Sequence, residues 1–114
     1  MSLKKIWNEI VRFNNEYFPG WKYRKGPLFF SVALSGETGE LCNLMKKLYG
    51  GGTNIVPVAG EDIVEECVDI LVYIVLLLES MGFSYRDYED MIYRKLAKLY
   101  ERMDMNRKAL GTTF

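Results

Sequence analysis

The sequence predicts an all-α chain whose four helices are arranged like a bundle. Apolar residues recur at helical spacing over long segments, and no segment shows the alternation typical of a strand. Proline and glycine residues separate these segments. The chain has 114 residues, which is the usual length of one domain. We therefore expect residues 1–114 to form a single helical domain.

Local signals place the ends of these helices. Ser2 is a suitable N-cap for the first helix, and Pro27 is favoured at the start of the second. Gly82 suits the end of the third helix, and Ser84 with Asp87 resembles a capping box for the fourth. The expected helices are 3–17, 27–49, 61–81 and 85–105.

Three segments are expected outside these helices. Residues 21–26 form a basic, aromatic loop, which either packs its rings on the core or serves as a flap whose Trp21 or Tyr23 stacks on a base. The glycine-rich segment 50–60 is expected to be a flexible connection, and 106–114 a frayed tail.

The composition excludes several classes of function. Lys and Arg total 15, as do Asp and Glu, so we expect neither a nucleic-acid nor a membrane partner. The absence of histidine excludes His-based catalysis and most zinc sites. Cys42 and Cys67 are interpreted as reduced core residues of a cytoplasmic protein. The longest apolar run, residues 70–78, is too short for a membrane span and indicates a buried helix segment.

Two pairs of acidic residues are predicted to face inward. Glu37 and Glu40 share one side of the second helix with apolar residues, and Glu66 and Asp69 do the same on the third. An unpaired carboxylate is costly in such surroundings. Either Lys and Arg from neighbouring helices neutralise these acids, or a hard divalent cation such as Mg²⁺ does.

The second half of the third helix is apolar on all sides, which predicts burial all round. A chain of this size can hardly enclose a whole helix. We therefore expect a partner subunit to cover it, so that the chain oligomerises through the region of the second and third helices.

A basic stripe borders the apolar face of the fourth helix. It consists of Lys95, Lys98 and Arg102, and Lys46 and Lys47 at the end of the second helix could join it. These residues either form salt bridges, with the aliphatic parts of their side chains lying on apolar surface, or bind phosphate opposite a metal ion.

Residues 33–41 and 65–73 together resemble the MazG-like all-α nucleoside triphosphate pyrophosphohydrolases, which are marked by Glu-x-x-Glu followed by Glu-x-x-Asp. The resemblance covers roughly residues 28–102. It implies a helical bundle that forms a homodimer or homotetramer and binds Mg²⁺, or Mn²⁺ in its place. The implied metal ligands are Glu37, Glu40, Glu66 and Asp69, and Glu37 is our choice for activating the water.

The resemblance also implies substrate-binding residues. Tyr73 matches an aromatic residue that contacts substrate in relatives, and Lys98 and Arg102 match a basic pattern of the family. Lys95 stands where that pattern has Asn, and Lys47 stands where some relatives have Trp, which argues against a stacking pocket like theirs.

The implied reaction is hydrolysis of a nucleoside or deoxynucleoside triphosphate to the monophosphate and pyrophosphate. Two alternatives stay open. One is a phosphoribosyl-ATP pyrophosphatase, which shares the fold and the acids. The other is a non-enzymatic helical interaction module, in which acids and bases merely pair across the bundle.

Overall fold

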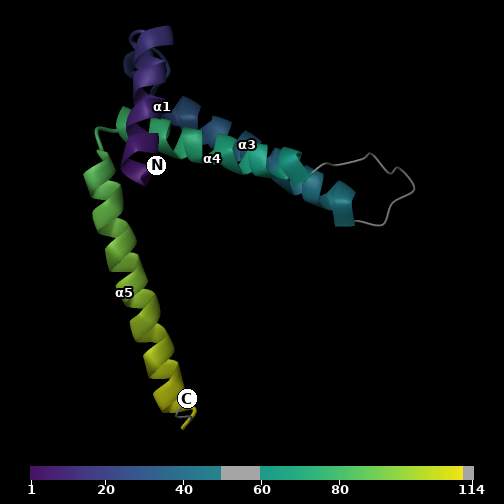
Figure 1. Cartoon of the computed structure of the whole chain (residues 1–114), viewed down its shortest axis with the longest axis vertical. Coiled ribbons are helices and arrows are strands. Elements are labelled where there is room, and N and C mark those ends of the chain that lie inside the picture. The colour runs from purple at the N-terminus through teal and green to yellow at the C-terminus, as the bar shows by residue number, and fades with distance from the viewer. Residues whose placement is uncertain (50–59, 112–114) are drawn as a thin grey trace. The chain divides into compact units, whose positions relative to one another are not determined.

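The computed structural model describes residues 1–49 and 60–111, which form five α-helices and no strand (Figure 1). The helices are α1 (Leu3–Tyr17), α2 (Trp21–Arg24), α3 (Gly26–Tyr49), α4 (Gly60–Ser80) and α5 (Tyr85–Ala109). The all-α class is confirmed. The expected number of four helices is wrong, because residues 21–24 form a short helix where a loop was expected. The chain divides into two compact units, Met1–Gly82 and Phe83–Phe114, and each is described by itself.

The first unit begins with α1, whose start follows from its cap. The Ser2 hydroxyl accepts a hydrogen bond from the backbone N–H of Lys5 at 3.2 Å, which satisfies a donor that the first turn leaves unpaired. After α1 the chain turns at Gly20, whose φ of 76° is a left-handed conformation that glycine adopts without strain. The single turn of α2 follows at once.

Helices α3 and α4 run antiparallel, side by side, and form the most extensive helix contact of this unit (Figure 1). At one end of the pair lies a core cluster of Trp21, Phe30 and Leu76, all nearly inaccessible to solvent. The rings of Trp21 and Phe30 pack edge to face, with centroids 5.5 Å apart. Of the two aromatic rings in segment 21–26, that of Trp21 is buried in the core, whereas that of Tyr23 is exposed.

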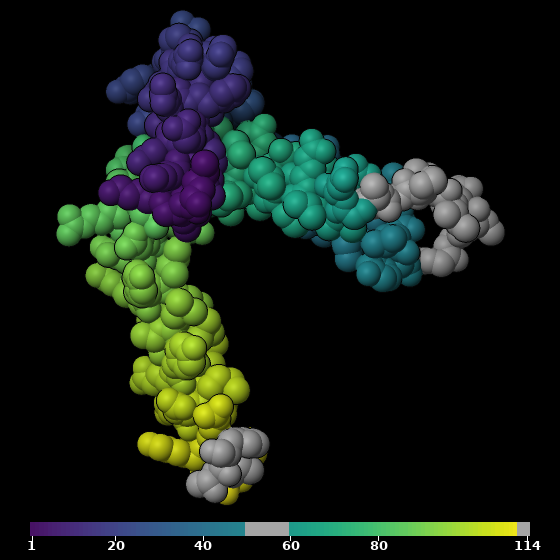
Figure 2. All heavy atoms as spheres, in the orientation of Figure 1, coloured from purple at the N-terminus to yellow at the C-terminus, as the bar shows by residue number. Residues whose placement is uncertain are grey.

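A polar contact at Glu79 fastens α1 and α2 to α4. The indole N–H of Trp7 donates to Oε1 of Glu79 at 2.7 Å, and the Lys22 ammonium lies 3.4 Å from Oε2. Trp7 is 1% exposed, so its N–H requires such an acceptor. In the space-filling view, purple atoms of α1 lie over one end of the α3–α4 pair (Figure 2).

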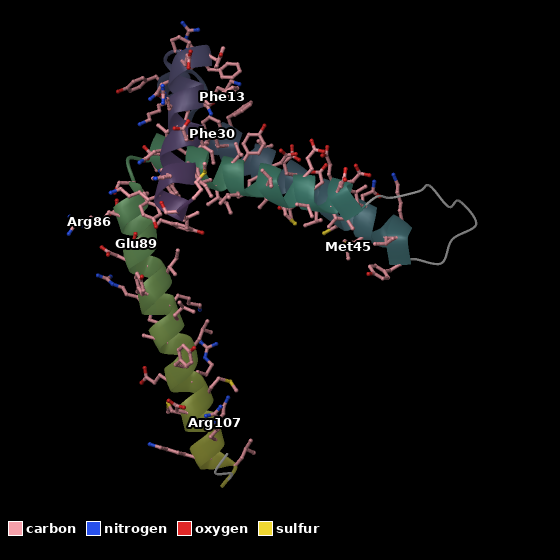
Figure 3. The ribbon with its side chains drawn as sticks, viewed as in Figure 1. Phe13, Phe30, Met45, Arg86, Glu89 and Arg107 are labelled. Atoms are coloured by element: carbon pink, nitrogen blue, oxygen red, sulfur yellow. The ribbon has the colours of Figure 1, made fainter. Side chains whose placement is uncertain are left out.

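The second unit consists of α5 and its flanks. The backbone N–H of Ser84 donates to Oδ2 of Asp87 at 2.8 Å, which is one of the two bonds of the expected capping box, and the Ser84 hydroxyl donates to the same oxygen at 3.1 Å. These bonds hold the pKa of Asp87 below its ordinary value. The helix continues to Ala109, so the expected frayed tail is wrong for residues 106–109. Figure 3 labels Arg86, Glu89 and Arg107 along this helix.

Other expectations have different outcomes. Cys42 and Cys67 are free thiols, but both are exposed, which corrects their placement in the core. The second half of α4 is partly covered within the first unit, because Val75 and Leu76 are buried and the rest of 70–78 is half-buried, and its covering by a partner subunit stays a prediction. The expected connection at 50–59 lies outside the described residues.

No single described helix is long and apolar enough to cross a membrane, and α4 and α5 reach that length and composition only when counted together.

Candidate metal centre

Three of the four predicted acids come together where α3 packs against α4. Residues three apart on a helix share a face, which places Glu37 beside Glu40 on α3 and Glu66 beside Asp69 on α4. One carboxylate oxygen from each of Glu37, Glu40 and Glu66 lies within 4.8 Å of the others. The antiparallel pairing of the two helices therefore converts two local motifs into one cluster.

The acids of this cluster differ in exposure. Glu37, Glu66 and Asp69 are half-buried, whereas Glu40 is exposed, so the expectation that all four face inward is wrong for Glu40. One oxygen of Glu37 and one of Glu66 are buried without any hydrogen-bond partner. A buried acceptor without a donor costs free energy, which makes these two atoms the points where a cation or proton would stabilise the fold most.

No basic side chain neutralises the cluster within the described part of Met1–Gly82. The ion pairs there join Arg12 to Glu9 and Lys22 to Glu79, and neither touches the four acids. Within this unit the acids thus have no Lys or Arg partner among the described residues, and pairing with basic residues of α5 stays one of the two explanations.

The mutual repulsion of these carboxylates has a clear electrostatic consequence. The pKa of Glu66 is raised from its ordinary 4.5 to about 7. The main cause is its hydrogen-bonding contact with the Glu37 side chain, followed by burial and by the negative charges of Glu40, Glu37 and Asp69. Glu66 therefore keeps its proton to a higher pH than an ordinary glutamate does, unless another positive charge replaces that proton.

The donor set fits a small divalent cation. Carboxylate oxygens are the ligands that Mg²⁺ prefers, at about 2.0–2.1 Å, so two ligands on opposite sides of the ion lie about 4.2 Å apart. The 4.8 Å within which the three oxygens already lie is close to that span. Small side-chain movements would bring Glu37, Glu40 and Glu66 around one ion, and Asp69 adds charge beside them.

A cavity of about 630 Å³ opens beside the acids. Glu37, Asp69 and Tyr73 line it on the side of α3 and α4. The remaining lining is mostly apolar, includes several aromatic rings, and comes largely from the first 30 residues. It includes Phe13 and Phe30, which Figure 3 labels at the end of the α3–α4 pair where α1 packs, whereas Met45 is labelled toward the other end of α3. A ligand in this cavity would contact apolar side chains and would also lie within reach of the acidic residues at its edge.

The other predicted site residues are placed as follows. Tyr73 is half-buried in the cavity wall, with its ring centroid 6.5 Å from that of Phe30. Lys47 is exposed in the last turn of α3. Lys95, Lys98 and Arg102 are exposed on α5, in the second unit, where Lys98 and Arg102 border one surface depression. Their role toward substrate stays a prediction.

Sequence reasoning missed two polar residues of the cavity, Glu9 and Asn14, which both lie on α1. Asn14 lines the cavity and is 9% exposed. A signal was present, because Asn14 follows Trp7 and Ile10 at helical spacing and so interrupts an apolar stripe. An amide on such a stripe is buried when the stripe packs inward.

Comparison with known proteins identifies one structural relative. A scan of protein-family models gives no match, and a search of curated proteins gives no significant one. Among solved structures, the chain is similar to that described as the putative pyrophosphatase YPJD from Bacillus subtilis, with 25% identity and a TM-score of 0.64. The match covers 84% of this chain and 93% of that one. The chain shares the fold of that protein.

Proposed function

We propose that this chain is a Mg²⁺-dependent hydrolase that converts a nucleoside or deoxynucleoside triphosphate into the monophosphate and pyrophosphate. The observation that carries the proposal is the cluster of Glu37, Glu40 and Glu66, which has no basic partner among the described residues of its unit and borders a cavity. The fold supports it, because the structural relative is described as a putative pyrophosphatase. Asp69 completes the proposed ligand set.

The reaction breaks one phosphoanhydride bond. Water adds its oxygen to the α-phosphorus, the bond from that phosphorus to the bridging oxygen breaks, and pyrophosphate leaves. When bound, Mg²⁺ would make a water more acidic and offset the negative charge of the phosphates. Glu37, which has a buried oxygen without a donor, is suited to orient the attacking water and accept its proton.

The chain's own residues divide the remaining work. Glu40, Glu66 and Asp69 hold the cation, and Tyr73 packs against the substrate in the cavity. Lys98 and Arg102 of α5 are proposed to bind the leaving pyrophosphate, with Lys95 and Lys47 contributing positive charge nearby. No side-chain nucleophile is needed, which suits a chain without histidine.

We also propose that the active form is a homodimer or homotetramer. Apolar side chains of the α3–α4 pair support this, since Val32 on α3 and Val64 and Val68 on α4 are more than half exposed in the single chain. Exposed apolar side chains on paired helices are typical of interfaces between subunits.

The direct test is a turnover assay. Pyrophosphate release is measured for ribo- and deoxyribonucleoside triphosphates and phosphoribosyl-ATP, with and without Mg²⁺. We expect Glu40→Gln to lower kcat by about a hundredfold or more while circular dichroism shows an intact fold. Glu65→Gln, an exposed neighbour outside the cluster, is the matched control and should retain activity. Equal release by wild type and Glu40→Gln, or none from any nucleotide, would refute the proposal.

A further inference from the structure

The inference starts from Asn14, the buried polar residue of the described chain. Its Nδ2 donates to the backbone carbonyl of Ile10 at 3.2 Å. A carbonyl only accepts hydrogen bonds, so the side-chain nitrogen is the atom turned toward the helix. The oxygen of the Asn14 amide is left as the acceptor, and no described residue of its unit donates to it. Buried amides normally use both ends, so this acceptor is available to a ligand.

The lining around Asn14 offers more hydrogen-bond acceptors than donors, the available donors being the Lys25 ammonium and the Tyr73 hydroxyl. The indole N–H of Trp21 donates to Oδ1 of Asn15 at 2.9 Å and is thereby engaged. The Lys25 ammonium lies over the rings of Phe18 and Phe29, at 5.5 and 4.6 Å from their centroids. The lining acids add further acceptors, among them Glu9, Glu37 and Asp69. A ligand that donates hydrogen bonds therefore matches this cavity better than one that accepts them.

The walls indicate the shape of that ligand. Trp21, Phe30 and Tyr73 present ring surfaces, and the edge-to-face contact of Trp21 with Phe30 fixes their orientation. Flat aromatic rings stack favourably on such walls. The volume of about 630 Å³ lies in the range of about 300–1,000 Å³ typical of small-molecule sites.

We propose that the Asn14 side-chain oxygen accepts a hydrogen bond from an exocyclic amino group on a flat nitrogen heterocycle in this cavity. Rings that carry the amino group are thereby preferred to those that carry a carbonyl at that position. This inference rests on the proposed function, since the heterocycle would be the base of the nucleotide whose phosphates meet the acids. A carbonyl there would place two acceptors against each other in a largely apolar cavity, and mismatches of this kind discriminate strongly.

The test compares ring pairs that differ in amino or carbonyl substitution. Cytidine against uridine and adenosine against inosine are titrated by tryptophan fluorescence, since Trp21 lines the cavity. These nucleosides need neither metal nor turnover. We expect the amino member of at least one pair to bind about tenfold tighter or better. Equal binding, or tighter binding of both carbonyl members, overturns the proposal without any variant.

Variants assign the preference to Asn14. Asn14→Leu keeps the approximate size but removes the acceptor, so the preference should fall to about one. Asn14→Asp keeps an acceptor and should retain it. Asn8→Leu, at an exposed position of α1, is the control and should behave as wild type. A preference that persists in Asn14→Leu overturns the assignment.

The kcat/KM values for dCTP against dUTP and for ATP against ITP, measured with Mg²⁺, separate this inference from the proposed function. Turnover without a preference for the amino member refutes the role of Asn14 and leaves the hydrolase standing. Preferential nucleoside binding without turnover of any nucleotide refutes the hydrolase and supports the role of Asn14.

Discussion

Glu37 and Glu66 contact each other across the α3–α4 pair, and each has one carboxylate oxygen buried without a hydrogen-bond donor. The Glu37 carboxylate therefore raises the pKa of Glu66 and makes it more difficult to ionise. Two kinds of positive charge relieve this repulsion, a shared proton at low pH and a cation at high pH. The first two predictions distinguish these two states.

Mg²⁺ is expected to raise the thermal stability of the protein. A ligand at about 100 times its Kd stabilises the folded state by about 2.7 kcal/mol, which corresponds to a rise in Tm on the order of 10 °C for a chain of this size. Differential scanning fluorimetry with Mg²⁺ and with a chelator measures the shift. Glu66→Gln should lose most of it, whereas Glu65→Gln should keep it. An unchanged Tm in the wild type would argue against the metal centre.

The metal-free protein is expected to lose stability as the pH rises. The pKa of Glu66 is higher in the folded state, about 7, than its ordinary 4.5, so the folded state binds more protons between these values. The stabilisation is fully present below about pH 4.5 and is lost as the pH rises through about 7. Urea unfolding of wild type and Glu66→Gln across this window isolates the contribution of Glu66. Parallel pH profiles would contradict the assignment.

Trp7→Phe is expected to lower the free energy of unfolding by about 1–3 kcal/mol. The ring remains buried, but the 2.7 Å hydrogen bond to Glu79 is lost and a partly buried carboxylate oxygen loses its donor. Urea denaturation gives the difference. Tyr23→Phe, at a side chain that is 95% exposed, should leave the stability unchanged and serves as the control.

Gly36→Ala tests whether a partner covers the face of α3 near the acids. A Cβ added there meets no atom within 4 Å in the single chain, so the better helix propensity of alanine should stabilise the protein by up to about 1 kcal/mol. If a second subunit packs closely at this position, the same change will instead destabilise the assembly. Chemical denaturation combined with light scattering distinguishes a stabilised chain from a weakened oligomer.

The periodicity of the sequence was sufficient to predict the long helices and the grouping of acids within each. Glu37 with Glu40 and Glu66 with Asp69 follow from the repeat of 3.6 residues, and antiparallel neighbours are expected for consecutive helices. The proximity of Glu37 and Glu66 also depends on the register between α3 and α4, which no local pattern specifies. Their roles as metal ligands stay a prediction.

Other features depend on tertiary contacts that a local pattern does not contain. Helix α2 has four residues, too few for a periodic signal, and it is held by Trp21 and Lys22. The exposure of Glu40 could not be predicted, because its place on the apolar stripe does not say where the contact with α4 ends. The use of Asn14 in the cavity wall likewise depends on how α1 crosses its neighbours.

The cavity wall and the acid cluster come from largely different parts of the chain. Most of the aromatic wall belongs to the first 30 residues, whereas the four acids lie on the later α3–α4 pair. Substitutions in α1 and α2 could therefore change the ligand specificity of the cavity, while the acidic cluster on the two long helices stays the same. An architecture of this kind allows a lineage to diversify its ligands by altering a short amino-terminal stretch.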